Sequence, residues 1–146
     1  MFILYYSNSG YTKEYAEMFA DFTDLKIYSY EELKNHVTID KEIIFFSNLQ
    51  AGKINKYKEI NQKYTILDTF VCGLDNKVLL RQDKLRDDYQ NQNIYYGPGG
   101  FNKEKLSSLN RCLMRLIFHK NKEIYNHGIN LVEKKYLNSL FKKYQK

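Results

Sequence analysis

Two serines, a threonine, an asparagine and a glycine stand close together near the start of the chain, in Ser7-Asn8-Ser9-Gly10-Tyr11-Thr12. Hydroxyl groups and the unpaired N–H groups at the start of a following helix together favour an anion. The segment contains no Lys or Arg, so its donors are neutral. Neutral donors suit a phosphate monoester better than a triphosphate, which usually brings a P-loop lysine and Mg²⁺. The segment therefore predicts a site for a single phosphate group.

Other phosphate-binding motifs do not fit this segment. It lacks the Gly-Lys-Ser/Thr of a P-loop, and Gly10 is the only glycine available for a dinucleotide-binding G-x-G-x-x-G. A phosphatase loop would need a nucleophilic Cys and a following Arg, and a receiver domain would need acidic residues at the strand ends to hold Mg²⁺. The remaining alternative is that the segment is only a capped helix start.

Buried strands and amphipathic helices alternate along the chain. Continuous apolar runs such as Ile43-Ile44-Phe45-Phe46 are typical of strands buried on both faces. Strands are expected at residues 2–6, 25–29, 43–46, 64–72 and 94–96, and helices at 15–22, 54–63, 79–89, 106–117 and 137–144. A short helix or a turn is expected at residues 30–35. The alternation implies right-handed βαβ units, hence an α/β fold with a doubly wound parallel sheet and helices on both faces. Ligands bind such sheets at the carboxyl ends of the strands, which directs attention to the loops after Tyr6, Ser47 and Gly73.

Length and composition indicate one domain that spans residues 1–146. The chain is 43% hydrophobic and 27% charged, which excludes a disordered or low-complexity protein. Its two cysteines, Cys72 and Cys112, are too few for a disulfide scaffold and indicate a reducing compartment. No apolar run approaches the roughly 20 residues that span a bilayer, and the first residues do not resemble a secretory signal. We expect a cytoplasmic protein.

The positive charge is concentrated in the last third of the chain. Residues 1–100 hold 12 Lys and Arg against 14 Asp and Glu, whereas residues 101–146 hold 11 against 3. Such a basic segment is either a solvated helix face or a surface for an acidic partner protein or an anionic membrane. The 14 Tyr and 9 Phe fall mostly at core spacing rather than beside basic residues, so nucleic acid is not expected as a partner.

Three segments resemble the flavodoxins, in the order in which that family has them. Ser-x-Ser-Gly-x-Thr after the first strand is similar to their loop for the phosphate of flavin mononucleotide (FMN). The segment IIFFSNLQAGKI (residues 43–54) resembles the isoalloxazine loop of flavodoxin-domain proteins, including menaquinone-dependent protoporphyrinogen oxidases. YYGPGGFNKEKLSSLNRCLMRLI (residues 95–117) looks like the last strand and last helix of that subgroup. The resemblance implies a flavodoxin-like sheet of five strands in the order 2-1-3-4-5.

The resemblance also implies which residues hold the FMN. The phosphate would lie in the first loop, and the ring between the second and third loops. The Ala51-Gly52 peptide is the candidate partner of flavin N5, because glycine permits the peptide to flip. The implied cofactor-binding residues are Ser7, Asn8, Ser9, Gly10, Tyr11, Thr12, Ser47, Asn48, Leu49, Gln50, Ala51, Gly52, Gly73, Leu74 and Asp75.

As function, the resemblance implies FMN-dependent electron transfer to redox partner proteins. One alternative is an oxidoreductase that acts directly on a quinone or porphyrinogen-type substrate, although no long insertion that could form a substrate site is evident. The other is a binding domain that has kept the fold without the flavin. No constellation of residues supports acid–base or covalent catalysis, so the flavin would carry the chemistry.

Two departures from the family concern the flavin site and the end of the chain. Leu49 and Leu74 stand where flavodoxins often have aromatic rings, so stacking would come from Tyr11 or Tyr95 if those side chains are not core. Residues 130–146 are expected as an added amphipathic helix. Its lysines make contact with a membrane surface conceivable, but a helix packed on the domain is the simpler expectation. Cys112 is expected in the core, on the helix at 106–117.

Overall fold

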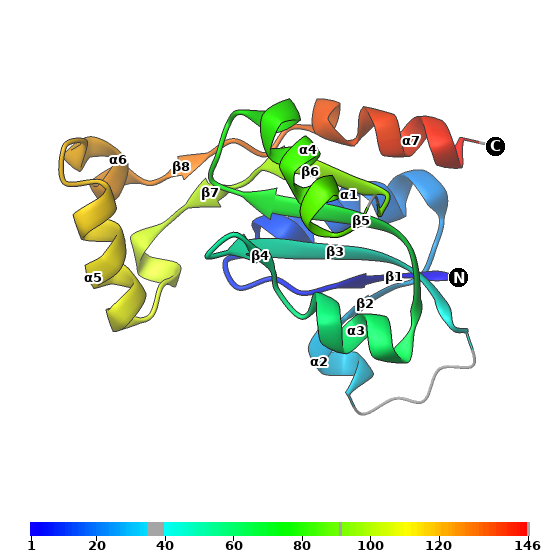
Figure 1. Cartoon of the computed structure of the whole chain (residues 1–146). Helices are drawn as coiled ribbons and strands as arrows, with labels where there is room; N and C mark the ends of the chain where they lie inside the picture. Colours follow the sequence, from blue (N-terminus) through cyan, green and yellow to red (C-terminus); the bar gives the residue numbers. More distant parts are fainter. Residues whose placement is uncertain (35–39, 91, 146) are drawn as a thin grey trace.

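A five-stranded parallel sheet forms the centre of the molecule in the computed structural model, which describes residues 1–34, 40–90 and 92–145. The strands are β1 (Phe2–Tyr5), β2 (Ile27–Ser29), β3 (Glu42–Gln50), β5 (Thr65–Gly73) and β6 (Ile94–Pro98), in the order β2-β1-β3-β5-β6 (Figure 1). A two-residue strand, β4 (Lys53–Ile54), pairs antiparallel with the end of β3. The predicted α/β class, strand order and parallel pairing are confirmed.

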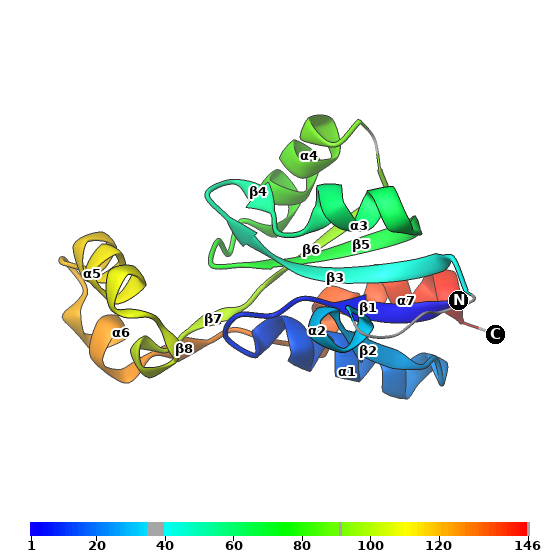
Figure 2. The same cartoon turned by 90° about the horizontal axis from the view of Figure 1, so that it is seen from below.

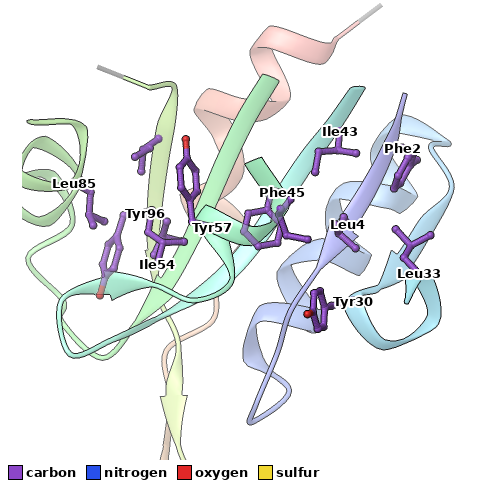
Figure 3. Close-up of a cluster of buried hydrophobic side chains, with 13 residues drawn as sticks. Phe2, Leu4, Tyr30, Leu33, Ile43, Phe45, Ile54, Tyr57, Leu85 and Tyr96 are labelled. Carbon is purple, nitrogen blue, oxygen red and sulfur yellow. The ribbon is translucent and has the colours of Figure 1, made fainter. Parts of the chain in front are cut away.

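Each face of the sheet has its own apolar core, because successive residues of a strand point to opposite faces. On one face, Phe2 and Leu4 of β1 belong to the cluster drawn in Figure 3. The helices on that face are α2 (Tyr30–Leu33), α3 (Tyr57–Lys63) and α4 (Val78–Asp88). On the other face, Ile3 packs with α1 (Tyr11–Thr23) and α7 (Asn138–Tyr144). Figure 2 shows α3 and α4 on one side of the sheet and α1 and α7 on the other.

Residues 99–131 form a separate lobe beyond the carboxyl ends of the strands (Figures 1 and 2). Its neck is an antiparallel pair, β7 (Gly100–Phe101) with β8 (Ile129–Asn130). Between them lie a 3₁₀ turn, η1 (Lys103–Lys105), and two helices, α5 (Ser108–Ile117) and α6 (Lys122–His127). A second 3₁₀ turn, η2 (Lys134–Leu137), then leads back to α7. A long insertion, which was not evident in the sequence, is therefore present between β6 and α7.

The lobe also corrects the prediction for the last two helices. The helix at 106–117 was expected to cover the sheet, but α5 stands away from it and Leu109 is 81% exposed. The sheet face is covered instead by α7. Leu140 of this helix and Leu137, the residue just before it, are fully buried. Helix α7 thus completes the core, whereas residues 130–146 were expected only as an addition to the fold. Cys112, expected in the core, is exposed on α5.

The helix predicted at 54–63 is shorter than expected. It begins at Tyr57, because Lys53 and Ile54 pair with β3 as β4. The turn between β3 and β4 has positive φ at both central residues, 48° at Ala51 and 77° at Gly52. Positive φ at both positions is the geometry of a two-residue type I′ hairpin, so a hairpin occupies the place of the first helical turn.

Candidate functional site

A cleft of about 310 Å³ lies where the three predicted loops and the lobe meet. It sits at the carboxyl ends of β1, β3 and β5, beside the point where the strand order reverses between β1 and β3. From the sheet side it is lined by Asn8, Ser9, Tyr11, Thr12, Asn48, Leu49, Gln50, Ala51, Cys72, Gly73 and Leu74. The structure therefore brings together all three loops, which are up to 66 positions apart in the sequence, as from Asn8 to Leu74.

Five of the expected residues are not among those that line this cleft: Ser7, Gly10, Ser47, Gly52 and Asp75. The Ser7 hydroxyl accepts a bond from the Gly10 N–H at 3.0 Å. Ser47 is buried and donates to the Asn55 carbonyl at 2.7 Å. The Asp75 carboxylate accepts from the Lys77 N–H at 2.9 Å and from Arg81 at 2.8 Å. These side chains shape the loops, and Gly52 supplies the tip of the hairpin.

The first loop presents the start of α1 to the cleft. Gly10 has φ of 92° and is the residue before the helix, a conformation that glycine adopts without strain. The first N–H groups of a helix have no partner within it and carry the positive end of the helix dipole. Ser7 and Gly10 also border a second hollow of about 340 Å³ on the β2 side of the loop, together with Lys13. The loop is thus accessible from two sides.

Lys105 of the lobe reaches this loop, a contact that could not be predicted from the sequence. Its Nζ donates to the Ser9 carbonyl at 3.3 Å and lies 5.4 Å from the centre of the Tyr11 ring. The two residues in the hydrogen bond are 96 positions apart, and only the path of the lobe brings them together. The first loop has no Lys or Arg of its own, but the fold places the Lys105 ammonium beside it.

The second loop carries an unsatisfied polar atom. The side-chain oxygen of Asn48, Oδ1, is buried and has no hydrogen-bond partner among the described residues. A buried acceptor without a partner costs about 1–3 kcal/mol, so the site favours a ligand that brings an N–H donor. Ala51, which also lines the cleft, has a positive φ, which is uncommon for a residue with a side chain. Strained residues of this kind cluster at functional sites.

The third loop and the neck of the lobe meet at the floor of the cleft. The Gly99 N–H donates to the Gly73 carbonyl at 2.6 Å. A Cβ on Gly99 would lie 2.4 Å from Cys72 Sγ, and one on Gly100 would lie 2.5 Å from the Tyr11 ring. The glycines after β6 therefore let the chain pass directly against the floor of the cleft before it enters the lobe.

Burial raises the pKa of the Cys72 thiol to about 12, so this thiol stays protonated at neutral pH.

The lobe supplies an apolar wall to the cleft. Its lining residues are Gly100, Phe101, Asn102, Leu106, Asn110, Leu113, Met114 and Ile117, together with Gly99 at the neck. On the sheet side, Leu49 and Leu74 line the cleft, so the two residues expected in place of aromatic rings are both at the site. Of the two tyrosines considered for stacking, Tyr11 lines the cleft and Tyr95 packs against the core with α1 and α7. None of the described residues that line the cleft is an Asp or Glu.

Comparison with known proteins gave no match, either to a family model or to a curated protein. In the described ranges, no group of three or more His, Cys, Asp or Glu side chains could hold a metal ion. No helix in those ranges has both the length and the apolar character to cross a membrane. The geometry of the cleft is therefore the main evidence on function.

Proposed function

We propose that this chain binds FMN in the cleft between the three loops and the lobe, and transfers electrons through it. The observation that carries the proposal is the division of the cleft into two ends. One end has hydroxyl and helix N–H donors with the Lys105 ammonium beside them. The other end has leucine side chains and a buried, unpartnered amide oxygen. A phosphate ester joined to a flat ring system with N–H donors matches both ends.

The residues at the polar end suit the phosphate. Ser9 and Thr12 line the cleft at the start of α1, where an anion is stabilised by the helix dipole. Lys105 adds a positive charge to the neutral donors of the loop. Hydrogen bonds from a charged donor are about twice as strong as neutral ones, so we expect this end to dominate the discrimination between FMN and riboflavin.

The residues at the other end suit the ring. Leu49 and Leu74 offer apolar surface, and Asn48 Oδ1 offers an acceptor that has no protein partner. The Ala51-Gly52 turn projects from the end of β3 at the same place. When bound, FMN would supply the redox chemistry, while these residues would bind it, orient it and exclude water.

Titration with FMN tests the proposal directly. Purified protein is mixed with FMN and with riboflavin, and the quenching of flavin fluorescence is followed together with the absorption spectrum. We expect saturable binding of one FMN per chain and weaker binding of riboflavin. A colourless protein that quenches neither flavin would overturn the proposal and favour a binding domain that has kept the fold without the cofactor.

A second candidate function is favoured by the apolar wall of the lobe. Leu106, Leu113 and Ile117 line the cleft opposite Leu49 and Leu74, which would leave an apolar space beside a bound ring. An oxidoreductase that acts directly on a quinone or porphyrinogen-type substrate would use such a space. Steady-state turnover with a porphyrinogen as the electron donor and a soluble quinone as the acceptor separates the two functions: a pure electron carrier shows none, and an oxidoreductase loses turnover when Leu113 and Ile117 are changed to Ser while FMN binding persists.

A further inference from the structure

Helix α5 exposes an unusually large apolar surface. Leu109, Leu113, Leu116 and Ile117 are 81%, 55%, 67% and 59% exposed. Their spacing places all four on one side of the helix. Single exposed leucines are normal on protein surfaces, but a contiguous group of large apolar side chains marks an interaction site. The surface that these four residues form is here called the α5 apolar face.

The α5 apolar face points away from the centre of the lobe, and two of its residues, Leu113 and Ile117, also line the cleft. The opposite side of α5 makes the internal contacts: Arg111 Nε donates to the Lys103 carbonyl at 2.8 Å, and the Arg115 guanidinium lies 5.7 Å from the centre of the Tyr125 ring. The apolar centre of the lobe is small and consists of Phe101 with the rings of Phe118 and Tyr125. The helix thus packs through its basic side, and nothing in the described chain covers most of its apolar side.

The charge of the lobe indicates what could cover this face. Residues 99–131 contain six Lys and Arg against two Glu. A second copy of the chain would bring the same positive charge to the contact, and like charges brought together are unfavourable. An anionic lipid surface brings the opposite charge and an apolar layer directly beneath it. Short helices with Leu on one side and Arg or Lys on the other are typical of membrane-surface helices.

We propose that α5 lies in the surface of an anionic lipid membrane, with the α5 apolar face among the acyl chains and the lysines of the lobe at the headgroups. The proposal does not depend on FMN. It differs from the earlier expectation for residues 130–146, because Leu140 and Phe141 of α7 are buried against the sheet. Since Leu113 and Ile117 also line the cleft, the mouth of the cleft would open beside the lipid.

Co-sedimentation of the full chain with lipid vesicles tests the proposal. Vesicles of phosphatidylcholine alone are compared with vesicles that also contain phosphatidylglycerol. We expect pelleting with the second kind and little with the first, and reduced pelleting in high salt, because screening weakens surface electrostatics. Leu109 and Leu116 are not among the residues that line the cleft, so the variant Leu109→Ser/Leu116→Ser removes apolar surface without touching the flavin site.

A matched control is available on α4, where Leu79 and Leu80 are 75% and 68% exposed. Leu79→Ser/Leu80→Ser removes the same kind of surface elsewhere on the molecule. We expect the α5 variant to lose at least about 100-fold in vesicle partitioning, since each buried leucine contributes tenfold or more, and the control to match the unchanged protein. Lys120→Gln/Lys122→Gln should lose roughly tenfold on anionic vesicles.

Three results would overturn the proposal. The first is no pelleting of the unchanged chain with anionic vesicles. The second is equal loss in the α5 variant and the α4 control, which would indicate non-specific adsorption. The third is a dimer in sedimentation equilibrium that the α5 variant abolishes, which would assign the face to a second copy of the chain. Circular dichroism on each variant verifies that the lower pelleting does not come from unfolding.

Discussion

Helices α5 and α7 have similar amphipathic patterns, but the apolar side is buried in α7 and exposed in α5. Both place leucines and other apolar residues along one side, yet Leu140 and Phe141 of α7 are buried against the sheet and Leu109 of α5 lies in the open. The spacing of apolar residues therefore specifies that a helix has an apolar side, but not what lies against it. In this chain α5, which is nearer in sequence to β6, leaves the sheet, and the more distant α7 covers it.

An ion pair with a buried carboxylate holds α7 in its place. The Asp68 side chain is fully buried in β5, and Lys143 Nζ donates to its two oxygens at 2.7 and 2.8 Å. The Tyr144 hydroxyl donates to the same carboxylate at 2.5 Å. A buried carboxylate is costly without such partners, so α7 has a polar reason as well as an apolar one to lie on this face. Helix α5 has no comparable contact with the sheet among the described residues.

The largest expected difference between the two helices concerns stability. Leu140→Ala in α7 should lower the free energy of unfolding by about 3 kcal/mol, because it leaves a cavity in the core. Leu113→Ala in α5 should lower it by less than about 0.5 kcal/mol, because its side chain is largely in solvent. Urea unfolding of the two variants measures both. Equal losses would mean that α5 contributes to the folded core after all.

A smaller loss is expected from the ion pair. Lys143→Met removes the cation and leaves the buried Asp68 carboxylate with the side chains of Tyr144 and Tyr95 as partners. We expect a decrease of about 2 kcal/mol in the free energy of unfolding, below the 3–5 kcal/mol range for fully buried pairs, because the Lys143 side chain is partly exposed. Lys134→Met, on a lysine of η2 that has no contact with Asp68, is the matched control in the same urea experiment. A loss no greater than that of the control would show that α7 is held by its apolar side alone.

Lys105 of the lobe extends the comparison from stability to ligand binding, because we expect this residue to act in binding rather than in folding. Lys105→Gln should weaken FMN binding roughly fivefold to tenfold, as expected for loss of one exposed charge-assisted bond, and leave riboflavin binding and urea unfolding unchanged. Lys120→Gln, on the same lobe but outside the cleft, serves as the control. If both flavins lose affinity equally, Lys105 does not act on the phosphate.

The smallest expected effect appears at alkaline pH. Burial, and next the bond to Asp68, raise the pKa of Tyr144 above its ordinary value of 10.0. The unfolded chain therefore releases this proton first, so the contribution of Tyr144 to stability is complete below pH 10 and decreases as the pH rises above it. Thermal unfolding between pH 9 and about 11 should show a smaller decrease in Tm for Tyr144→Phe than for the unchanged chain. Parallel curves would show that this tyrosine does not titrate differently in the two states.

The sheet could be predicted from the sequence because its strands are continuous apolar runs. Continuous runs such as Ile43-Ile44-Phe45-Phe46 have few alternatives to a strand buried on both faces, and the connections between them leave little choice of topology. The loops at the cleft followed from the sheet, because the carboxyl ends of parallel strands lie at one edge. Asn48, Leu49 and Gln50 were found in this way.

The parts that could not be predicted depend on contacts between distant segments. Ser7 and Asp75 were expected to face a ligand, but their side chains bond to the backbone within three positions, which residue type alone does not reveal. Lys105 was missed for the opposite reason, because its partner lies 96 positions away. The lobe was missed because a Gly-rich exit from β6 reads equally well as a turn back onto the sheet.

The two cysteines differ in solvent exposure, so a thiol-reactive probe can be attached to the lobe alone. Cys112 is exposed on α5, whereas Cys72 is buried and its pKa is raised to about 12. A maleimide dye should therefore couple at Cys112 and leave Cys72 unmodified, because alkylation requires an accessible thiolate. The unaltered polypeptide thus accepts one polarity-sensitive fluorophore at the edge of the α5 apolar face, and its emission colour would report the surroundings of the lobe in real time.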